Sequence, residues 1–276
     1  MRTLSKDEVT ELHILSQAIR RNILHMVAAS KSSHVGSAFS IVEILVVLYK
    51  LILKNNNLNP NDPQRDRFLL SKGHGCSAVY SILAELGYFD KELLKEFSRD
   101  GSVLMSHINY DVPGVEFSTG SLGHALPIGL GMSLAAKTRQ EKWRTFVLLS
   151  DGELNEGSNW EAFLTAPHLS LESLIAIIDC NGIQGLGLTK DVISMEPLDE
   201  KFKAFGWEVE RIDGHDYNQL FETINKLVSS RSKKPKIIIA DTIKGKGVSF
   251  MENKIAWHYK SPSDEELVNA LKELEN

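Results

Sequence analysis

The chain has 276 residues, of which 42% are hydrophobic and 24% are charged, an ordinary globular composition that excludes disordered and fibrous classes. Its formal net charge of -5 disfavours a nucleic-acid-binding protein, because such proteins usually carry a basic excess. No apolar run approaches the roughly 20 residues needed to cross a bilayer, and the N-terminal segment has no apolar signal core. The two cysteines, Cys76 and Cys180, fit neither a zinc site nor a disulfide framework. We therefore expect a cytoplasmic enzyme that binds neither membrane nor nucleic acid.

Ser-x-x-Glu sequences predict where helices begin, because in a capping box the serine and the glutamate satisfy each other's free backbone amides. The chain has four such pairs: Ser5/Glu8, Ser40/Glu43, Ser158/Glu161 and Ser263/Glu266. The first pair precedes an apolar helical stripe made of Leu12, Leu15, Ile19, Ile23 and Met26. The last pair predicts a helix over residues 264–274.

Short runs of branched and aromatic residues with little polar alternation predict strands that are buried on both faces. The runs are 68–70, 146–149, 174–178 and 237–240. Predicted helices separate them, at 77–86, 126–138, 159–167, 198–205 and 217–229. This alternation predicts an α/β fold: a parallel sheet with helices on both faces and right-handed crossovers. Residues 55–63 form a predicted loop, and with no repeat or linker the chain is expected to be one domain.

Polar segments follow three of the predicted strands, at 71–75, 150–153 and 179–182. Ligands of an open α/β sheet bind at the carboxyl ends of the strands. Asp151 and Asn181 are about 30 residues apart, roughly one βαβ unit, so their oxygens converge if the two strands are neighbours. A carboxylate and an amide oxygen suit Mg²⁺ completed by phosphates and water, and Gly152 lets an anion approach the backbone. Asp-Gly and Asn-Gly are also common turn dipeptides, so the residues alone leave both interpretations open.

The segments 150–153 and 179–182 resemble the thiamine diphosphate signature, in which Gly-Asp-Gly is followed about 30 residues later by Asn, a separation of about one βαβ unit. Among the families that carry it, the chain most resembles transketolase. Further similarities lie at 33–36 (Ser-His-Val-Gly), 66–75 (Asp-Arg-Phe-Leu-Leu-Ser-Lys-Gly-His-Gly), 113–123, 244–247 (Lys-Gly-Lys-Gly) and Trp257-His258. The resemblance implies that residues 1–276 form one diphosphate-binding domain of the thiamine diphosphate-binding fold, which requires thiamine diphosphate and Mg²⁺.

The resemblance also implies roles for individual residues. Mg²⁺ would be held by Asp151, Asn181 and the backbone carbonyl of Ile183. The cofactor would be contacted by His74, Gly120, Ser121, Leu122, Gly152, Glu153, Asn181, Ile183, Lys244 and His258. Ketol transfer needs proton donors and acceptors that titrate near the working pH, and the candidate catalytic residues are His34, His74, His107 and His258.

Two further glutamates, Glu156 and Glu161, match acidic residues that link two cofactors across the family's dimer interface. Their alternative interpretation is a solvated helix face. A lone histidine is likewise more often structural than catalytic, so the case for the four histidines depends on the resemblance.

A complete transketolase also has a pyrimidine-binding domain and a C-terminal domain, and neither is present here. The chain therefore resembles the N-terminal subunit of a split transketolase, which moves a two-carbon ketol unit from a ketose phosphate to an aldose phosphate. A partner subunit would supply the glutamate that protonates the cofactor and most contacts to the substrate phosphate. We expect the chain to be inactive alone and to assemble as two copies of each subunit.

Three segments depart from the family pattern. Ser150 replaces the first glycine of Gly-Asp-Gly, and the segments 105–109 and 120–125 differ around the substrate funnel. These departures favour a dedicated pathway and a modified sugar. The alternatives are an α-subunit of a 2-oxo acid dehydrogenase, a nicotinamide dehydrogenase, and a non-catalytic module in which Ser150 marks a decayed site. The histidine set and the 71–75 motif favour transketolase over the 2-oxo acid dehydrogenase.

Overall fold

A computed structural model describes residues 2–275, which contain a five-stranded parallel sheet with the order β1-β2-β3-β5-β4. The strands are β1 (Arg67–Leu70), β2 (Thr145–Ser150), β3 (Leu174–Cys180), β4 (Glu208–Asp213) and β5 (Lys236–Asp241). The four predicted strands are confirmed as β1, β2, β3 and β5. The prediction of a parallel α/β sheet is therefore correct.

Strand β4 was missed by the sequence analysis. Its sequence, Glu-Val-Glu-Arg-Ile-Asp, alternates charged and apolar residues, and it lies at the sheet edge with β5 as its neighbour. An edge strand keeps charged side chains in solvent, which protects its free backbone groups from pairing with another chain. Continuously apolar runs are typical of central strands, so such a run does not mark this edge strand.

The helices predicted from periodicity are confirmed to within two residues at each end. The α-helices are α1 (Lys6–Ser30), α2 (Val35–Phe39), α3 (Val42–Val47), α4 (Cys76–Glu85), α5 (Ala125–Thr138), α6 (Gly157–His168), α7 (Thr189–Val192), α8 (Leu198–Phe205), α9 (Tyr217–Val228) and α10 (Asp264–Glu273). Shorter elements are the π-helical turn η1 (Leu48–Ile52) and the 3-10 helices η2 (Gly73–Gly75), η3 (Lys91–Glu96), η4 (Gly152–Asn155) and η5 (Ile255–His258).

Two of the four predicted capping boxes are confirmed. Ser5 caps α1 and Ser263 caps α10, each with its glutamate returning the bond. The predictions at Ser40 and Ser158 are wrong, because these hydroxyls bond to distant parts of the chain instead. Ser40 Oγ donates to Asp179 Oδ2 at 2.8 Å, and Ser158 Oγ donates to the carbonyl of Gly123 at 2.7 Å.

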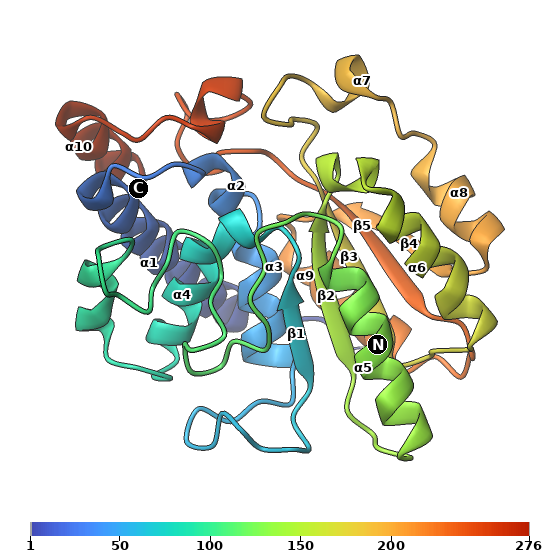
Figure 1. Cartoon of the computed structure of the whole chain (residues 1–276). Coiled ribbons are helices and arrows are strands. Elements are labelled where there is room, and N and C mark those ends of the chain that lie inside the picture. Colours follow the sequence, from blue (N-terminus) through green and yellow to red (C-terminus); the bar gives the residue numbers. More distant parts are fainter. Residues whose placement is uncertain (1, 276) are drawn as a thin grey trace.

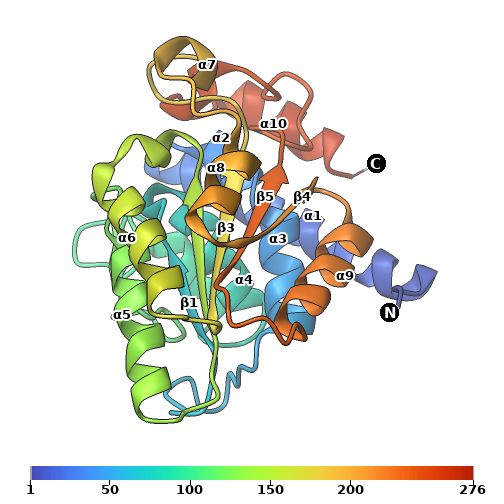
Figure 2. The same ribbon diagram turned by 90° about the vertical axis from the view of Figure 1, so that its right-hand side faces the viewer.

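The sheet is covered on both faces, as Figures 1 and 2 show. Side chains that alternate along β2 enter different cores: Val147 and Leu149 pack with α5, α6 and α8, whereas Phe146 and Leu148 pack with α1, α3, α4 and α9. Because both faces are apolar, polar side chains gather at the strand ends. Ser150 pairs with Asp179 in the β2–β3 register, so Asp151 and Asn181 follow the ends of neighbouring strands. Within residues 2–275, no helix is long and apolar enough to span a membrane.

Replacing the buried Phe163 of α6 with alanine tests the core between α6 and α8. The Phe163 ring is fully buried and lies 4.7 Å from Phe202 and 5.4 Å from Trp207, measured between ring centroids. We expect Phe163→Ala to lower the free energy of unfolding by about 3–5 kcal/mol, because it leaves a cavity. Urea denaturation followed by tryptophan fluorescence measures this change. The adjacent Leu164 is exposed, so Leu164→Ala should change stability by less than about 0.5 kcal/mol, and equal losses would contradict the packing.

Candidate active site

A cavity of about 280 Å³ lies at the carboxyl ends of β2 and β3. It brings together residues that are far apart in the sequence and that the resemblance had assigned to one site: His34, His74, His107, Gly120, Leu122, Asp151, Gly152, Glu153, Asn181, Ile183, Lys244 and His258. Ser121 is the candidate that does not line the cavity, and its side chain is exposed. The cavity also contains Lys72, Gln184 and Tyr259, which sequence reasoning did not assign to the site.

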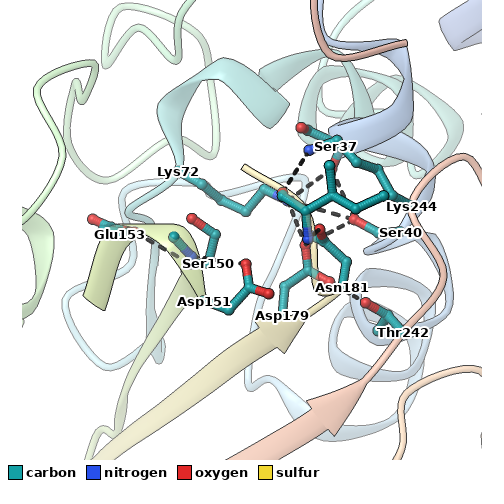
Figure 3. Close-up of polar contacts among 12 residues, drawn as sticks. Ser37, Ser40, Lys72, Ser150, Asp151, Glu153, Asp179, Asn181, Thr242 and Lys244 are labelled. Atoms are coloured by element: carbon teal, nitrogen blue, oxygen red, sulfur yellow. Dashed lines mark hydrogen bonds and ion pairs between the residues drawn. The ribbon is translucent and has the colours of Figure 1, made fainter. Parts of the chain in front are cut away.

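The fully buried carboxylate of Asp179 organises the floor of the cavity (Figure 3). Its Oδ2 accepts hydrogen bonds from Lys72 Nζ at 2.5 Å and from Asn181 Nδ2 at 2.9 Å, in addition to the bond from Ser40. Its Oδ1 accepts a bond from the Thr242 hydroxyl. Burial, the largest single effect, raises the pKa of Asp179, but the Lys72 charge and the hydrogen bonds from Lys72, Thr242 and Ser40 together hold the pKa below its usual value. The carboxylate therefore stays ionised and joins the ends of β1, β3 and β5.

Asp151 is hydrogen-bonded to the turn at residues 181–183. Asp151 Oδ2 accepts a hydrogen bond from the Gly182 amide at 2.6 Å, and Oδ1 accepts one from the Gly152 amide at 2.7 Å. Asn181 Oδ1 accepts from the Ile183 amide at 3.1 Å. Burial, with the nearby Asp179 charge, raises the pKa of Asp151 to about 6. Asp151 and the turn together offer a carboxylate, an amide oxygen and the carbonyl of Ile183, all hard oxygen donors of the kind that Mg²⁺ prefers.

Ser150 fits the strand without strain. It is the last residue of β2 and lies outside the positive-φ positions of the described chain. Its amide donates to Glu153 Oε2 at 3.3 Å. The serine in place of the family's glycine therefore gives no backbone reason to regard the site as decayed.

Glu153 is buried, and its carboxylate is bonded to protein groups. Oε1 accepts from the Gly123 amide at 2.9 Å and from the Ser71 hydroxyl, while Oε2 accepts from Ser150. Burial raises the pKa of Glu153 above its usual value. The side chain thereby holds the 120–123 loop against the ends of β1 and β2, where Gly120 and Leu122 line the cavity.

Four imidazoles form a cluster around His34. The centroid of the His34 ring lies 4.9 Å from that of His74, 5.2 Å from that of His258 and 6.1 Å from that of His107. Burial is the largest cause of a lowered pKa in each, assisted by neighbouring positive groups for all but His107. The pKa of His34 falls to about 4 and that of His258 to about 3. All four rings are consequently neutral at pH 7.

Lys244 joins the histidine cluster to the 181–183 turn. Its buried Nζ lies 3.1 Å from the carbonyl oxygen of Ile183 and 2.9 Å from His258 Nδ1. An ammonium group can only donate, so His258 Nδ1 accepts and the ring carries its hydrogen on Nε2. Burial, then the Lys72 charge, lowers the pKa of Lys244 to about 8. Lys72 is paired with Asp179, whereas the hydrogen bonds of Lys244 Nζ are to uncharged groups, so Lys244 makes the cavity a suitable place for an anion.

Glu156 and Glu161 lie beside the site but outside the cavity. Glu156 precedes α6 as its N-cap residue, Glu161 lies within that helix, and both side chains are exposed. The position is compatible with either of the two interpretations given above.

A family model described as the thiamine diphosphate binding domain of transketolase matches residues 13–274. The chain is 42% identical over 268 residues to one of the subunits of apulose-4-phosphate transketolase from Actinobacillus succinogenes, covering 96% of each chain. It is 38% identical over 270 residues to a 6-deoxy-6-sulfo-D-fructose transketolase subunit of a Clostridium strain, covering 98% of each. Transketolase from Campylobacter jejuni superposes with a TM-score of 0.90 at 31% identity, covering 96% of this chain and 43% of that one.

Asp179→Asn tests whether the buried ion pair supports the site. The substitution leaves the Lys72 ammonium buried without a countercharge, and we expect it to lower the free energy of unfolding by about 3–5 kcal/mol. Urea denaturation at pH 7 measures the loss. Glu92→Gln removes one partner of the exposed Glu92–Lys95 pair and should leave stability unchanged within error. Similar stabilities for the two variants would contradict the role of Asp179.

The histidine cluster predicts how stability depends on pH. The pKa of His34 is about 4 when folded and 6.5 when unperturbed, so the unfolded chain binds more protons in this window. The contribution of His34 to stability should therefore fall as the pH drops from 7 to 5, whereas Asp151, with its raised pKa, contributes in the opposite direction. Asparagine tolerates the positive φ of 75° at His34, so His34→Asn should weaken this fall without straining the backbone. Urea midpoints at the two pH values measure it, with the exposed His13→Asn as a control that keeps the wild-type dependence. A pH dependence in His34→Asn equal to that of the wild type would contradict the prediction.

Proposed function

Because the chain belongs to the transketolase family through its thiamine diphosphate-binding domain, we propose that it is the cofactor-binding subunit of a two-chain transketolase. Such an enzyme transfers a two-carbon ketol unit from a ketose phosphate to an aldose phosphate. The observation that carries the proposal is that one cavity contains both the oxygen donors of Asp151 and the 181–183 turn and the four neutral histidines. The family membership argues against the 2-oxo acid dehydrogenase and nicotinamide dehydrogenase alternatives.

The donor set fits a magnesium ion with a diphosphate. Asp151, Asn181 and the carbonyl of Ile183 would hold the cation, because they offer hard oxygens from the 181–183 turn and from the carboxylate hydrogen-bonded to it. Lys244 lies against the same carbonyl and would balance the diphosphate charge. When bound, thiamine diphosphate supplies a nucleophilic carbon that accepts the two-carbon unit. Gly120 and Leu122 would contact its aminopyrimidine ring from the cavity wall, whereas Ser121 would use its backbone.

The histidines would accept protons from the sugar and donate protons to it. A neutral imidazole can take a proton from a hydroxyl group, and the depressed pKa of His34 keeps it in this form. His258 has its Nδ1 occupied by Lys244, which leaves the Nε2 hydrogen to donate to a sugar oxygen. His74 and His107 flank the same space, and their roles as further donors or acceptors remain part of the proposal.

A partner subunit would complete the active site. The Actinobacillus and Clostridium relatives, which match this chain in length, are named as subunits, and the chain spans about two fifths of the Campylobacter transketolase chain. We propose that residues 1–276 are the diphosphate-binding domain, and that the partner carries the pyrimidine-binding domain with its glutamate and a C-terminal domain. Two copies of each chain would form the assembly, with Glu156 and Glu161 near the interface between cofactors.

The sugar is proposed to be a modified one. Apulose 4-phosphate and 6-deoxy-6-sulfo-D-fructose appear in the names of the relatives. The segments that depart from the family pattern, 105–109 and 120–125, contain His107, Gly120 and Leu122, which line the cavity. A dedicated pathway rather than central pentose metabolism is therefore the function that we favour.

Reconstitution tests the proposal. The chain is coexpressed with a companion chain that carries a pyrimidine-binding domain, and ketol transfer is measured with thiamine diphosphate and Mg²⁺. We expect activity in the complex, none in this chain alone, and loss of activity on metal removal with EDTA. Asp151→Asn should lower cofactor affinity, measured by calorimetry, by at least about 10- to 100-fold, because it removes a charged ligand and even altering the groups that orient such ligands costs this much.

The exposed Asp100→Asn serves as the matched control and should bind the cofactor like the wild type. Cofactor binding that is independent of both Mg²⁺ and Asp151 would overturn the assignment of the metal site. A complex that binds the cofactor but transfers no ketol unit from any sugar would overturn the activity.

A further inference from the structure

The cavity has a polar floor and an apolar rim. Asp151 and Asn181 at the floor are 4% and 6% exposed, whereas Tyr259 and Leu186 are 63% and 88% exposed and line the same cavity. The histidine cluster lies between these two levels, because His34 and His258 are half-buried. A sugar whose reacting carbons lie beside the histidines would therefore extend the rest of its chain toward Tyr259.

The ring of Tyr259 packs on the histidine cluster from the outside. Its centroid lies 4.5 Å from that of His258 and 5.8 Å from that of His34, with interplanar angles of 60° and 62°. Its backbone is held by hydrogen bonds at the end of η5, where the Tyr259 amide donates to the carbonyl of Ala256. Within residues 2–275 the Tyr259 hydroxyl makes no hydrogen bond, so it is free to bind a ligand.

Gly185 makes room for this ring. A Cβ atom at position 185 would lie only 2.5 Å from the Tyr259 hydroxyl oxygen and 3.2 Å from Cζ. Gly185 is absent from the positive-φ glycines, so its backbone does not itself require glycine. The missing side chain is instead needed for Tyr259 to reach across toward the 183–188 loop.

We propose that Tyr259, packed against Gly185, selects the part of the sugar beyond the two transferred carbons. This inference rests on the proposed function and adds a specificity-determining residue to it. The ring offers an apolar face, Leu186 adds apolar surface, and the phenol offers one hydrogen bond. Such a rim favours a compact, branched sugar over a linear chain lined with hydroxyls.

The lysine that follows Tyr259 in the chain, Lys260, is already paired with a carboxylate. Lys260 bonds to Glu266 and lies 4.6 Å from the centroid of the Trp257 ring. With its charge already neutralised, Lys260 gives the rim no strong attraction for a substrate phosphate. Tyr259 would therefore select the sugar by the shape of its carbon skeleton rather than by the charge of its phosphate.

The test measures kcat/KM of the reconstituted complex for three donors, D-xylulose 5-phosphate, D-fructose 6-phosphate and apulose 4-phosphate, which share the two transferred carbons. We expect Tyr259→Ala to lower kcat/KM for the branched apulose 4-phosphate by about tenfold relative to the two linear donors, as apolar contacts allow. Tyr259→Phe should keep the preference, because the ring remains. Gly185→Ala should reproduce the effect of Tyr259→Ala, because the new methyl group displaces the ring.

A double variant tests whether Gly185 acts through Tyr259. If Gly185 acts through Tyr259, adding Gly185→Ala to Tyr259→Ala should change the donor preference no further, whereas additive effects would overturn the proposed contact. Tyr110 is 64% exposed and does not line the cavity, so Tyr110→Ala is the matched control and should keep the wild-type preference. Equal loss for all three donors in Tyr259→Ala would assign the residue to the reacting end of the sugar and overturn the inference.

Two further results separate this inference from its premise. A wild-type complex that transfers no ketol unit from any of the donors would refute the proposed function itself. An active complex whose donor preference is unaffected by Tyr259→Ala would refute only the role of the rim. Assembly of the complex is measured by analytical ultracentrifugation, and weaker assembly of Tyr259→Ala would overturn the inference by placing the ring against the partner.

Discussion

The buried pair between Lys72 and Asp179 is the interaction on which the candidate site depends. Three strand ends and the segment after α2 meet at one carboxylate, through Lys72, Asn181, Thr242 and Ser40. A buried charge is tolerated only when it is paired and its oxygens are bonded, and here both conditions are met. The same bonds fix Asn181 beside Asp151. The ion pair thus positions the oxygen donors, although it stands outside the set of residues proposed to bind the metal.

Burial also determines the electrostatic character of the cavity. It keeps four imidazoles uncharged and raises the pKa of the Asp151 carboxyl, while Lys244 supplies a positive charge that acts on that carboxylate. A cation bound at Asp151 would favour the ionised carboxylate, and a diphosphate would be favoured by Lys244. The histidines are then left as neutral proton carriers beside the substrate. Cofactor retention and proton transfer therefore use separate residues within one small space.

Much of this site follows from the sequence because its residues lie at strand ends. Asp151 and Asn181 were identified from two apolar runs and the separation between them, and the structure places the two strands side by side. Glu153 lines the cavity, in keeping with the predicted cofactor contact, but the sequence does not indicate that its carboxylate is bonded to Ser71, Gly123 and Ser150. Lys72 was visible only as part of a motif, because nothing local indicates that its partner lies 107 positions away.

Local pattern alone determined the central strands, the long helices and the caps at Ser5 and Ser263, because each depends on neighbours within a few residues. Tertiary structure decided the rest. Ser40 and Ser158 hydrogen-bond to residues far along the chain instead of capping a helix. Strand β4 forms by pairing with β5, and Tyr259 contacts Gly185 only in the folded chain. The physical reason is the same throughout: periodicity reports which face of an element is buried, but the partner of a buried polar group is set by packing.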